Sequence, residues 1–531
     1  MNARRGSGGW GAPGRTLNMA KRADPKQIEF LVHQAAMLER TGRVHEAIDA
    51  MVSATQAAPA RADLAHRAGV LMIRGRRYRD AVAMLTRASA LAPKDAVIHH
   101  DLGTALFRDG EFGRAAERFE RAHGLEPTNA VHLVSLAFAR ERLRDRAGAM
   151  AAAESALALD PSNGSAMVVV ADELVRSGRA EEAIAMAGRA LATALPGRME
   201  ARAHHVQGRA LERLERYDEA FAAHMRCNEA VRVRAGGQAA LEKPVERLMR
   251  DVRREGLAAV FQRWATEAPA HTPDPVFLCG FPRSGTTVVE QIIGMLPGVA
   301  TNDEQAHAGL VLREMDRARP GMLDGELVEA FDRLSPDEVA RYRAMLWAQI
   351  VERMPGYGAG TIAIDKQPLR LMDLVLVQRL FPRARMIVMV RDPRDVCLSA
   401  LFQNFDPNPA MARFLTVETT GAFYAEVMSF WVEMRGIVTM PWMEVKYRDL
   451  VRDLAGQSRR IAEFLGVEWT PDVARFHEAA GERAVTSASY NAVTEGINDR
   501  SVGRWRKYAA HLGPVIAAVR PIVDAYGYEA E

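Results

Sequence analysis

A fixed period runs through the first half of the chain. Prolines recur at a constant interval, at Pro59, Pro93, Pro127 and Pro161. Two columns of small residues keep the same interval. The first is Ala47, Ala81, Ala115, Ala149 and Ala183, and the second is Ala35, Gly69, Gly103, Ala137 and Ala171. After a short insertion, Gly208 and Ala220 continue the last two columns. A fixed period of this length indicates stacked units, each of which buries its apolar surface against its neighbours.

Each unit is predicted to contain two helices, a short turn between them and a closing proline. The periodic small residues are expected where the paired helices cross closely. In one unit a helix over Leu102–Arg108 is followed by Asp109-Gly110, a helix over Phe112–Leu125, and Pro127. The unit length and the placement of its alanine, small and proline residues resemble the tetratricopeptide repeat. The resemblance implies about six repeats stacked into a superhelix. Such an array can bind a protein or peptide partner, or serve as a scaffold or subunit surface, and the residues leave both open.

Composition excludes several classes of protein. With 531 residues, the chain is too long for one core, so we expect two or three domains. A net charge of +3 gives no whole-chain signal for nucleic acid, and no run of about 18 apolar residues predicts a membrane span. The three cysteines are far apart in sequence, which fits neither a disulfide framework nor a zinc site and favours a reducing, cytoplasmic location.

The pattern changes after a proline-rich stretch near Pro273. Short apolar segments then alternate with helical periodicity, which predicts an α/β domain with a central parallel sheet of the P-loop type. The expected segments are a disordered tail (1–26), the repeat array (27–233), a bridging helix and linker (234–273) and the α/β domain (274–531). The predicted strands are Val276–Cys279, Thr361–Ile364, Arg385–Val390 and Met443–Lys446, and the predicted helices are Thr286–Met295, Leu369–Leu380, Arg394–Phe402 and Leu450–Leu465.

A glycine-bounded loop follows the first predicted strand. Gly280 and Gly285 have the spacing of a phosphate-binding P-loop, but Thr286 stands where the usual lysine would be. The glycines allow an anion to approach the backbone, and the helix N-terminus favours negative charge. Arg283 supplies a cation inside the loop. The missing lysine argues against a nucleoside triphosphatase or kinase, which we keep as the alternative.

Polar side chains follow all four predicted strands. The strand ends deliver Arg283, Asp365-Lys366, the segment Arg391–Arg394, and Tyr447-Arg448. In open parallel sheets, ligands bind beyond the carboxyl ends of the strands. Mostly cationic groups therefore converge at one edge, which predicts an anionic ligand.

At this point the second half resembles the sulfotransferases that use 3′-phosphoadenosine 5′-phosphosulfate (PAPS). The segment Pro282–Thr287 is similar to their 5′-phosphosulfate loop, and Arg391–Ser399 is similar to their 3′-phosphate motif. Within the family, the tyrosylprotein sulfotransferase branch is the most similar, because an acid, Glu304, follows the loop arginine at that branch's spacing and a Lys-x-Pro element begins at Lys366. Fusion to tetratricopeptide repeats is an arrangement found among bacterial sulfotransferases.

The resemblance implies a role for each site residue. The 5′-phosphosulfate of the donor would be bound by Arg283, Ser284, Gly285, Thr286 and Thr287. The 3′-phosphate would be bound by Arg391 and Ser399, and Tyr447 would lie near that end of the nucleotide. Glu304 would be the general base, Lys366 would neutralise the bridging oxygen, and Ser487 would bind the same oxygens. The chemistry needs no metal. The acceptor hydroxyl could belong to a protein tyrosine, a saccharide, a lipid or a small molecule.

Three alternatives stay open from the sequence. Glu304 precedes a predicted helix and could be only an acid of its N-cap region, or Asp303 could be the cap and Glu304 the base. His307 is another candidate base. Ser489 is an alternative to Ser487. Finally, the chain could be a non-catalytic repeat adaptor with a relic nucleotide-binding domain, although the retained charged residues argue against decay.

Overall fold

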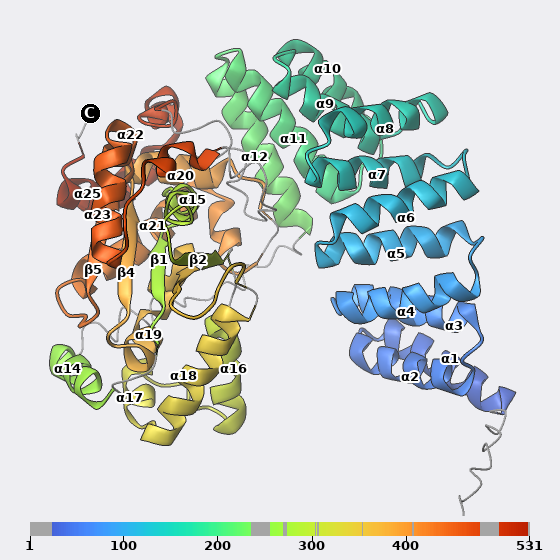
Figure 1. Cartoon of the computed structure of the whole chain (residues 1–531). Helices are drawn as coiled ribbons and strands as arrows, with labels where there is room; N and C mark the ends of the chain where they lie inside the picture. Colours follow the sequence, from blue (N-terminus) through green and yellow to red (C-terminus); the bar gives the residue numbers. More distant parts are fainter. Residues whose placement is uncertain are drawn as a thin grey trace, which may run out of the picture. The chain divides into compact units, whose positions relative to one another are not determined.

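A computed structural model describes residues 24–234, 255–268, 273–302, 304, 307–352, 354–405, 408–477 and 499–528 (Figure 1). The chain divides into two compact units, Met1–Val170 and Ala171–Glu531. The division falls inside helix α9 (Gly164–Arg176), within the predicted repeat array.

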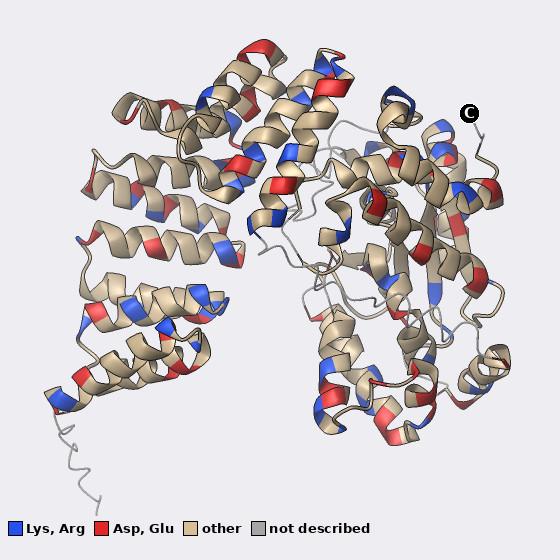
Figure 2. Ribbon diagram, turned by 180° about the vertical axis from the view of Figure 1, so that it is seen from behind, with Lys and Arg blue, Asp and Glu red and all other residues tan. Residues whose placement is uncertain are grey.

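The first unit is built from consecutive helix pairs. Its complete helices are α1 (Pro25–Arg40), α2 (Val44–Ala57), α3 (Ala62–Arg74), α4 (Tyr78–Leu91), α5 (Ala96–Asp109), α6 (Phe112–Leu125), α7 (Ala130–Arg142) and α8 (Arg146–Leu159). Each periodic proline lies two residues beyond the end of the second helix of a pair, as Pro93 does after α4. Acidic and basic residues both occur along these helices (Figure 2), which agrees with the low net charge.

The periodic small residues lie where paired helices cross. A Cβ added to Gly103 in α5 would lie 2.7 Å from the ring of Phe119 in α6. In the second unit, a Cβ on Gly208 of its helix pair would lie 2.6 Å from the ring of His224, which stands at the position equivalent to Phe119. The prediction that these positions allow close helix crossing is confirmed.

The second unit contains the remaining helices and one sheet. After α9, its helices are α10 (Ala180–Leu191), α11 (Gly197–Arg213), α12 (Tyr217–Arg234), α14 (Leu257–Glu267), α15 (Thr286–Ile293), α16 (His307–Ala318), α17 (Leu327–Asp332), α18 (Pro336–Val351), α19 (Leu374–Leu380), α20 (Pro393–Leu401), α21 (Val417–Met434), α22 (Tyr447–Arg452), α23 (Leu454–Leu465) and α25 (Gly513–Tyr526). Short 3₁₀ helices are η1 (Pro368–Asp373), η2 (Met411–Phe414), η3 (Pro471–Arg475) and η5 (Arg504–His511).

The sheet is parallel and has five strands in the order β2-β3-β1-β4-β5. They are β1 (Val276–Gly280), β2 (Val299–Asn302), β3 (Ile362–Lys366), β4 (Arg385–Val390) and β5 (Trp442–Lys446). The fold prediction is confirmed, but β2 was missed because half of its residues, Thr301 and Asn302, are polar. The predicted segment Thr361–Ile364 ended too early, since β3 continues to Lys366.

Alternate strand residues enter two separate cores. Val276 and Leu278 of β1 pack with α15 and α23, whereas Phe277 and Cys279 pack with helices that include α19 and α21. This is the period-two alternation of a sheet that is covered on both faces.

The last repeat pair, α11 and α12, belongs to one of these cores. Leu211, Ala220 and Ala223 lie in the same buried cluster as the sheet residues Phe277 and Val388. The side chain of Asn228 also donates a hydrogen bond of 3.0 Å to the carbonyl of Leu401 at the end of α20. These helices therefore help to position α20.

Among the described helices, none combines the length and apolar character needed to cross a membrane. Of the predicted bridging helix and linker (234–273), the structure describes residues 234, 255–268 and 273, which include α14. The domain boundaries stated above stay predictions.

Candidate functional site

The turn between β1 and α15 adopts a backbone that only a few residues tolerate. The φ angles of Gly280, Arg283 and Gly285 are +152°, +73° and +106°. A Cβ on Gly280 would lie 2.6 Å from the Met389 carbonyl, and one on Gly285 would lie 2.6 Å from the ring of Tyr447. Glycine is therefore required at both ends of the loop. A non-glycine residue with positive φ between them, Arg283, is the kind of backbone strain that is found at functional sites.

This turn presents hydrogen-bond donors around a buried hydroxyl. Ser284 is buried, and its Oγ has no hydrogen-bond partner within the part of the chain that the structure describes. Gly285 is the N-cap of α15 and supplies no side-chain cap. The first N–H groups of a helix have no partner inside the helix. An anion seated at this turn would satisfy the hydroxyl and these N–H groups together.

The two predicted phosphate motifs form one continuous cluster. Arg283 Nε donates a hydrogen bond of 3.1 Å to Ser399 Oγ, and Arg391 Nη1 donates one of 3.1 Å to the Arg283 carbonyl. The guanidinium of Arg391 lies 4.9 Å from the centre of the Tyr447 ring, and its Nη2 donates to the Ser501 carbonyl at 2.5 Å. The structure thus brings together residues that are far apart in the sequence.

Positive charge accumulates in this cluster. Burial, with the nearby charge of Arg391 as the next cause, lowers the pKa of Arg283 to about 10. The guanidinium stays protonated at neutral pH. An anion between two cations would relieve their repulsion, so the cluster is suited to phosphate or sulfate.

A second cluster surrounds Lys366 at the end of β3. The side chain of Lys366 is 0% exposed, and its Nζ lies 3.2 Å from Glu304 Oε1 and 3.3 Å from Glu290 Oε2. Glu304 follows β2, and its side chain is 38% exposed. The neighbouring strands β2 and β3 therefore bring the predicted base and the predicted lysine into contact.

Sequence reasoning missed Glu290 in this cluster. It occupies α15, one turn beyond Thr286, among the apolar residues Val288, Val289 and Ile292. A single carboxylate in such a helix was the available signal. Ser487, its alternative Ser489 and the possible cap Asp303 lie outside the described residues.

Some polar residues at the strand ends are used in internal ion pairs. Asp365 is fully buried and pairs with Arg370 at 2.6 Å. Arg394 pairs with Asp392 at 2.8 Å and stacks on Trp505. The expectation that whole segments after the strands face one ligand was too broad, because adjacent strand residues point to opposite faces.

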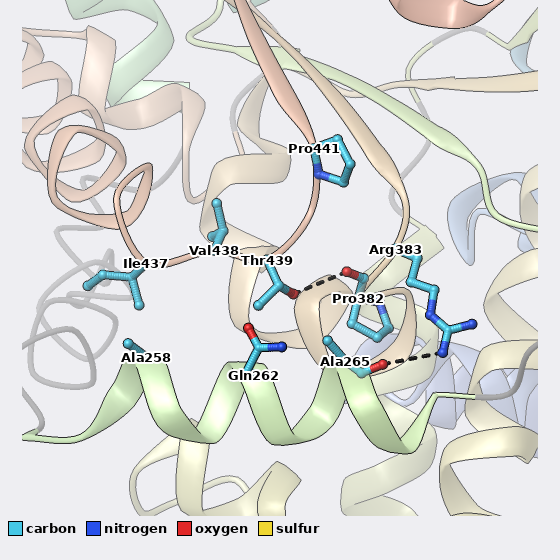
Figure 3. A pocket seen from close by; sticks show the side chains of 9 residues that line it. All are labelled: Ala258, Gln262, Ala265, Pro382, Arg383, Ile437, Val438, Thr439 and Pro441. Atoms are coloured by element: carbon cyan, nitrogen blue, oxygen red, sulfur yellow. Dashed lines mark hydrogen bonds between the residues drawn. The ribbon is translucent and has the colours of Figure 1, made fainter.

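A cavity of about 420 Å³ lies at the other end of the sheet (Figure 3). Pro382 and Pro441, which line it, precede β4 and β5. In its wall, Thr439 Oγ1 donates to the Pro382 carbonyl at 3.1 Å. Of the predicted site residues that the structure describes, none lines this cavity. Within the described ranges, no group of three or more His, Cys, Asp or Glu side chains is arranged to bind a metal.

The chain matches the model of the sulfotransferase family over residues 275–471. The C-terminal part of this chain is a sulfotransferase family domain. The matched range of this sulfotransferase domain contains both the loop and the Lys366 cluster.

Several proteins are similar to the chain. Protein-tyrosine sulfotransferase A of Caenorhabditis elegans is 24% identical over 249 residues, which are 43% of this chain and 60% of that protein. Protein-tyrosine sulfotransferase 2 of Gallus gallus is 24% identical over 53% of this chain and 78% of its own length. An uncharacterized protein of Aquifex aeolicus (strain VF5) is 26% identical over 61% of this chain, but the match spans only 42% of that protein.

Solved structures that are similar to the chain include a MamA protein and Pseudomonas aeruginosa pilF. The MamA protein is 18% identical and covers 33% of this chain and 100% of its own, with a TM-score of 0.30. The pilF structure is 17% identical and covers 38% of this chain and 91% of its own, with a TM-score of 0.33.

Proposed function

We propose that the chain transfers a sulfuryl group from PAPS to an acceptor hydroxyl. The observation that carries this proposal is the cationic cluster at the carboxyl edge of the sheet. There, Arg391 bonds to the backbone of Arg283, next to the buried hydroxyl of Ser284. The family of the domain supports sulfuryl transfer, and two anionic groups on one nucleotide would match the two cations.

In this proposal, the loop and α20 bind the two ends of the donor. The N-terminus of α15, with Gly285, Thr286 and Thr287, would bind the 5′-phosphosulfate together with Arg283 and Ser284. Arg391 and Ser399 would bind the 3′-phosphate, and Tyr447 would pack beside them. A hydrogen bond of 3.1 Å from Arg283 Nε to Ser399 Oγ joins the residues for the 5′-phosphosulfate to those for the 3′-phosphate. Binding of one of these groups would therefore affect the residues that bind the other.

The proposed reaction is an in-line displacement at sulfur. A carboxylate oxygen of Glu304 accepts the proton of the acceptor hydroxyl as the new oxygen–sulfur bond forms. The bond between sulfur and the bridging oxygen breaks, and its electron pair stays on the phosphate of the leaving adenosine 3′,5′-bisphosphate. Lys366, which is 3.2 Å from Glu304, would stabilise the charge on that oxygen. Ser487 is proposed to assist there.

A protein tyrosine is the acceptor that we would test first. Two similar proteins are named protein-tyrosine sulfotransferases, and a phenolic hydroxyl is a suitable proton donor to a carboxylate. A peptide bound by the repeat helices would be one source of such a tyrosine.

The test is transfer of ³⁵S from labelled PAPS to tyrosine-containing peptides, with Glu304→Gln as the matched variant. We expect transfer by the wild-type chain and a loss of about 10²- to 10⁴-fold in the variant, with nucleotide binding retained. ATP hydrolysis without PAPS binding would instead support the triphosphatase alternative.

A further inference from the structure

The buried carboxylate of Glu290 has a specific and unusual environment. All residues of its helix, Thr286–Ile293, are buried. Thr301 Oγ1 lies 3.3 Å from Glu290 Oε1 and donates to it, and Lys366 Nζ lies 3.3 Å from Glu290 Oε2, an ion-pair contact without the geometry of a hydrogen bond. Because a buried carboxylate is costly without partners, these contacts are needed to keep Glu290 inside the fold.

Lys366 is therefore shared by two carboxylates that differ in access. The side chain of Glu290 is 6% exposed, whereas that of Glu304 is 38% exposed. The two oxygens lie at almost equal distances from Nζ, 3.3 and 3.2 Å. An acceptor can approach Glu304, but Glu290 lies on the buried side of the lysine.

The charges of Lys366, Glu290 and Glu304 explain how Glu290 can influence Glu304. One ammonium and two carboxylates together carry a net negative charge. When Glu304 takes a proton from an acceptor, the remaining pair of Lys366 and Glu290 is neutral. Without the negative charge of Glu290, the ammonium would attract Glu304 more strongly, and this attraction would make Glu304 a weaker base.

We propose that Glu290 is a positioning residue that holds Lys366 from behind and leaves Glu304 basic enough to accept the acceptor proton. This inference rests on the proposed function and adds a residue to it. The role is indirect, because Glu290 acts through Lys366 and faces no substrate.

Two other charged groups lie near this cluster in the part of the chain that the structure describes. Arg283, from the loop, is close enough to Glu304 that the carboxylate favours the protonated form of the Arg283 guanidinium. Asp365 is adjacent to Lys366 on β3 but packs on the opposite face of the strand, where it pairs with Arg370. Glu290 is the carboxylate that meets the lysine from α15.

The test compares the full chain with its Glu290→Gln variant. We expect kcat to fall about 10- to 100-fold and the acidic limb of its pH profile to move to lower pH, while the Kd for adenosine 3′,5′-bisphosphate changes less than about 2-fold. A fall in kcat with an unmoved limb, or an unchanged kcat, would overturn the proposal. Glu463→Gln, an exposed change on α23, should alter none of these quantities.

A conservative variant separates charge from packing. Glu290→Asp keeps the negative charge, so its acidic limb should stay at the wild-type pH even where kcat is reduced. If the acidic limbs of the Glu290→Asp and Glu290→Gln variants lie at the same pH, the negative charge of Glu290 does not have the proposed role.

A third measurement does not need turnover. If Glu290 and Lys366 interact, the Tm of Glu290→Gln/Lys366→Met should lie about 3 °C or more above the value expected from adding the two single losses. Additive losses would reject the inference. An inactive wild-type chain that also fails to bind the bisphosphate would reject the proposed function instead.

Discussion

Glu212 in α11 accepts two hydrogen bonds from the guanidinium of Arg504, at 2.5 and 2.6 Å, although 292 positions separate the two residues. The neighbours of Arg504 are held from the other side: the N–H groups of Gly503 and Trp505 donate to Asp395 of α20 at 2.7 and 2.9 Å. A helix of the last repeat and the helix that follows Arg391 therefore hold the same segment of chain.

Substitution of Glu212 should destabilise the second unit. Glu212→Ala leaves the partly buried guanidinium of Arg504 without its carboxylate, so we expect the free energy of unfolding to fall by about 1–3 kcal/mol. Urea denaturation measures this change. The exposed pair Arg216–Glu219 is the control, and Glu219→Ala should destabilise the chain far less. Equal losses in both variants would show that the contact with Arg504 has no special role.

Replacement of Arg391 by lysine should weaken donor binding. A lysine keeps the charge but lacks the planar guanidinium, whose Nη1 and Nη2 bond separately to the carbonyls of Arg283 and Ser501. We expect the Kd of adenosine 3′,5′-bisphosphate to rise about 10- to 100-fold in Arg391→Lys, measured by calorimetry. Arg460→Ala, on the exposed side of α23, should bind as the wild type does. Unchanged affinity in the lysine variant would remove Arg391 from the proposed site.

Gly285 should not tolerate a side chain. In Gly285→Ala, the added Cβ would lie 2.6 Å from the ring of Tyr447, and the backbone has φ of +106°. We expect a loss of at least about 1–3 kcal/mol in the free energy of unfolding, together with weaker bisphosphate binding. Gly436 has no positive φ and has open space around it, so Gly436→Ala is the matched control. A fully stable Gly285→Ala variant would contradict the loop geometry.

Two histidines between α11 and α12, His205 and the buried His224, should make stability depend on pH. Burial lowers the pKa of His205 to about 4 and that of His224 well below its ordinary value. The unfolded chain therefore binds more protons than the folded one below about pH 6.5, and stability falls as the pH falls from there toward about 4.

At pH 5 we expect a loss of about 2 kcal/mol from His205 relative to pH 7, and a further loss from His224, measured by urea denaturation. The His224 ring stacks on Phe402 at 4.0 Å, so His224→Phe keeps the apolar contact and should reduce the loss. A pH dependence that is the same in this variant would rule out His224 as its source.

Parts of this molecule could be predicted from local sequence. The repeat period placed Gly103 and Gly208 at helix crossings, because close packing at a crossing requires a small residue in each unit. The loop from Gly280 to Gly285 was recognisable because its backbone conformation requires glycine at fixed positions.

Other features depend on packing across the sheet and could not be predicted in this way. The contact of Lys366 with both Glu290 and Glu304 requires β2, β3 and α15 to be in register. The bond from Arg283 to Ser399 crosses 116 positions and depends on the neighbouring strands β1 and β4. Glu212 was not a candidate at all, since its partner lies beyond the whole α/β sheet in the sequence.

Calorimetric titration with adenosine 3′,5′-bisphosphate, compared with adenosine 5′-monophosphate, tests the central claim most directly. If the loop and Arg391 each bind one phosphate, the bisphosphate should bind at least about 10-fold more tightly than the monophosphate, and Arg391→Ala should remove most of that difference. Equal affinities for the two nucleotides, or no binding of either, would contradict a donor site at this edge of the sheet.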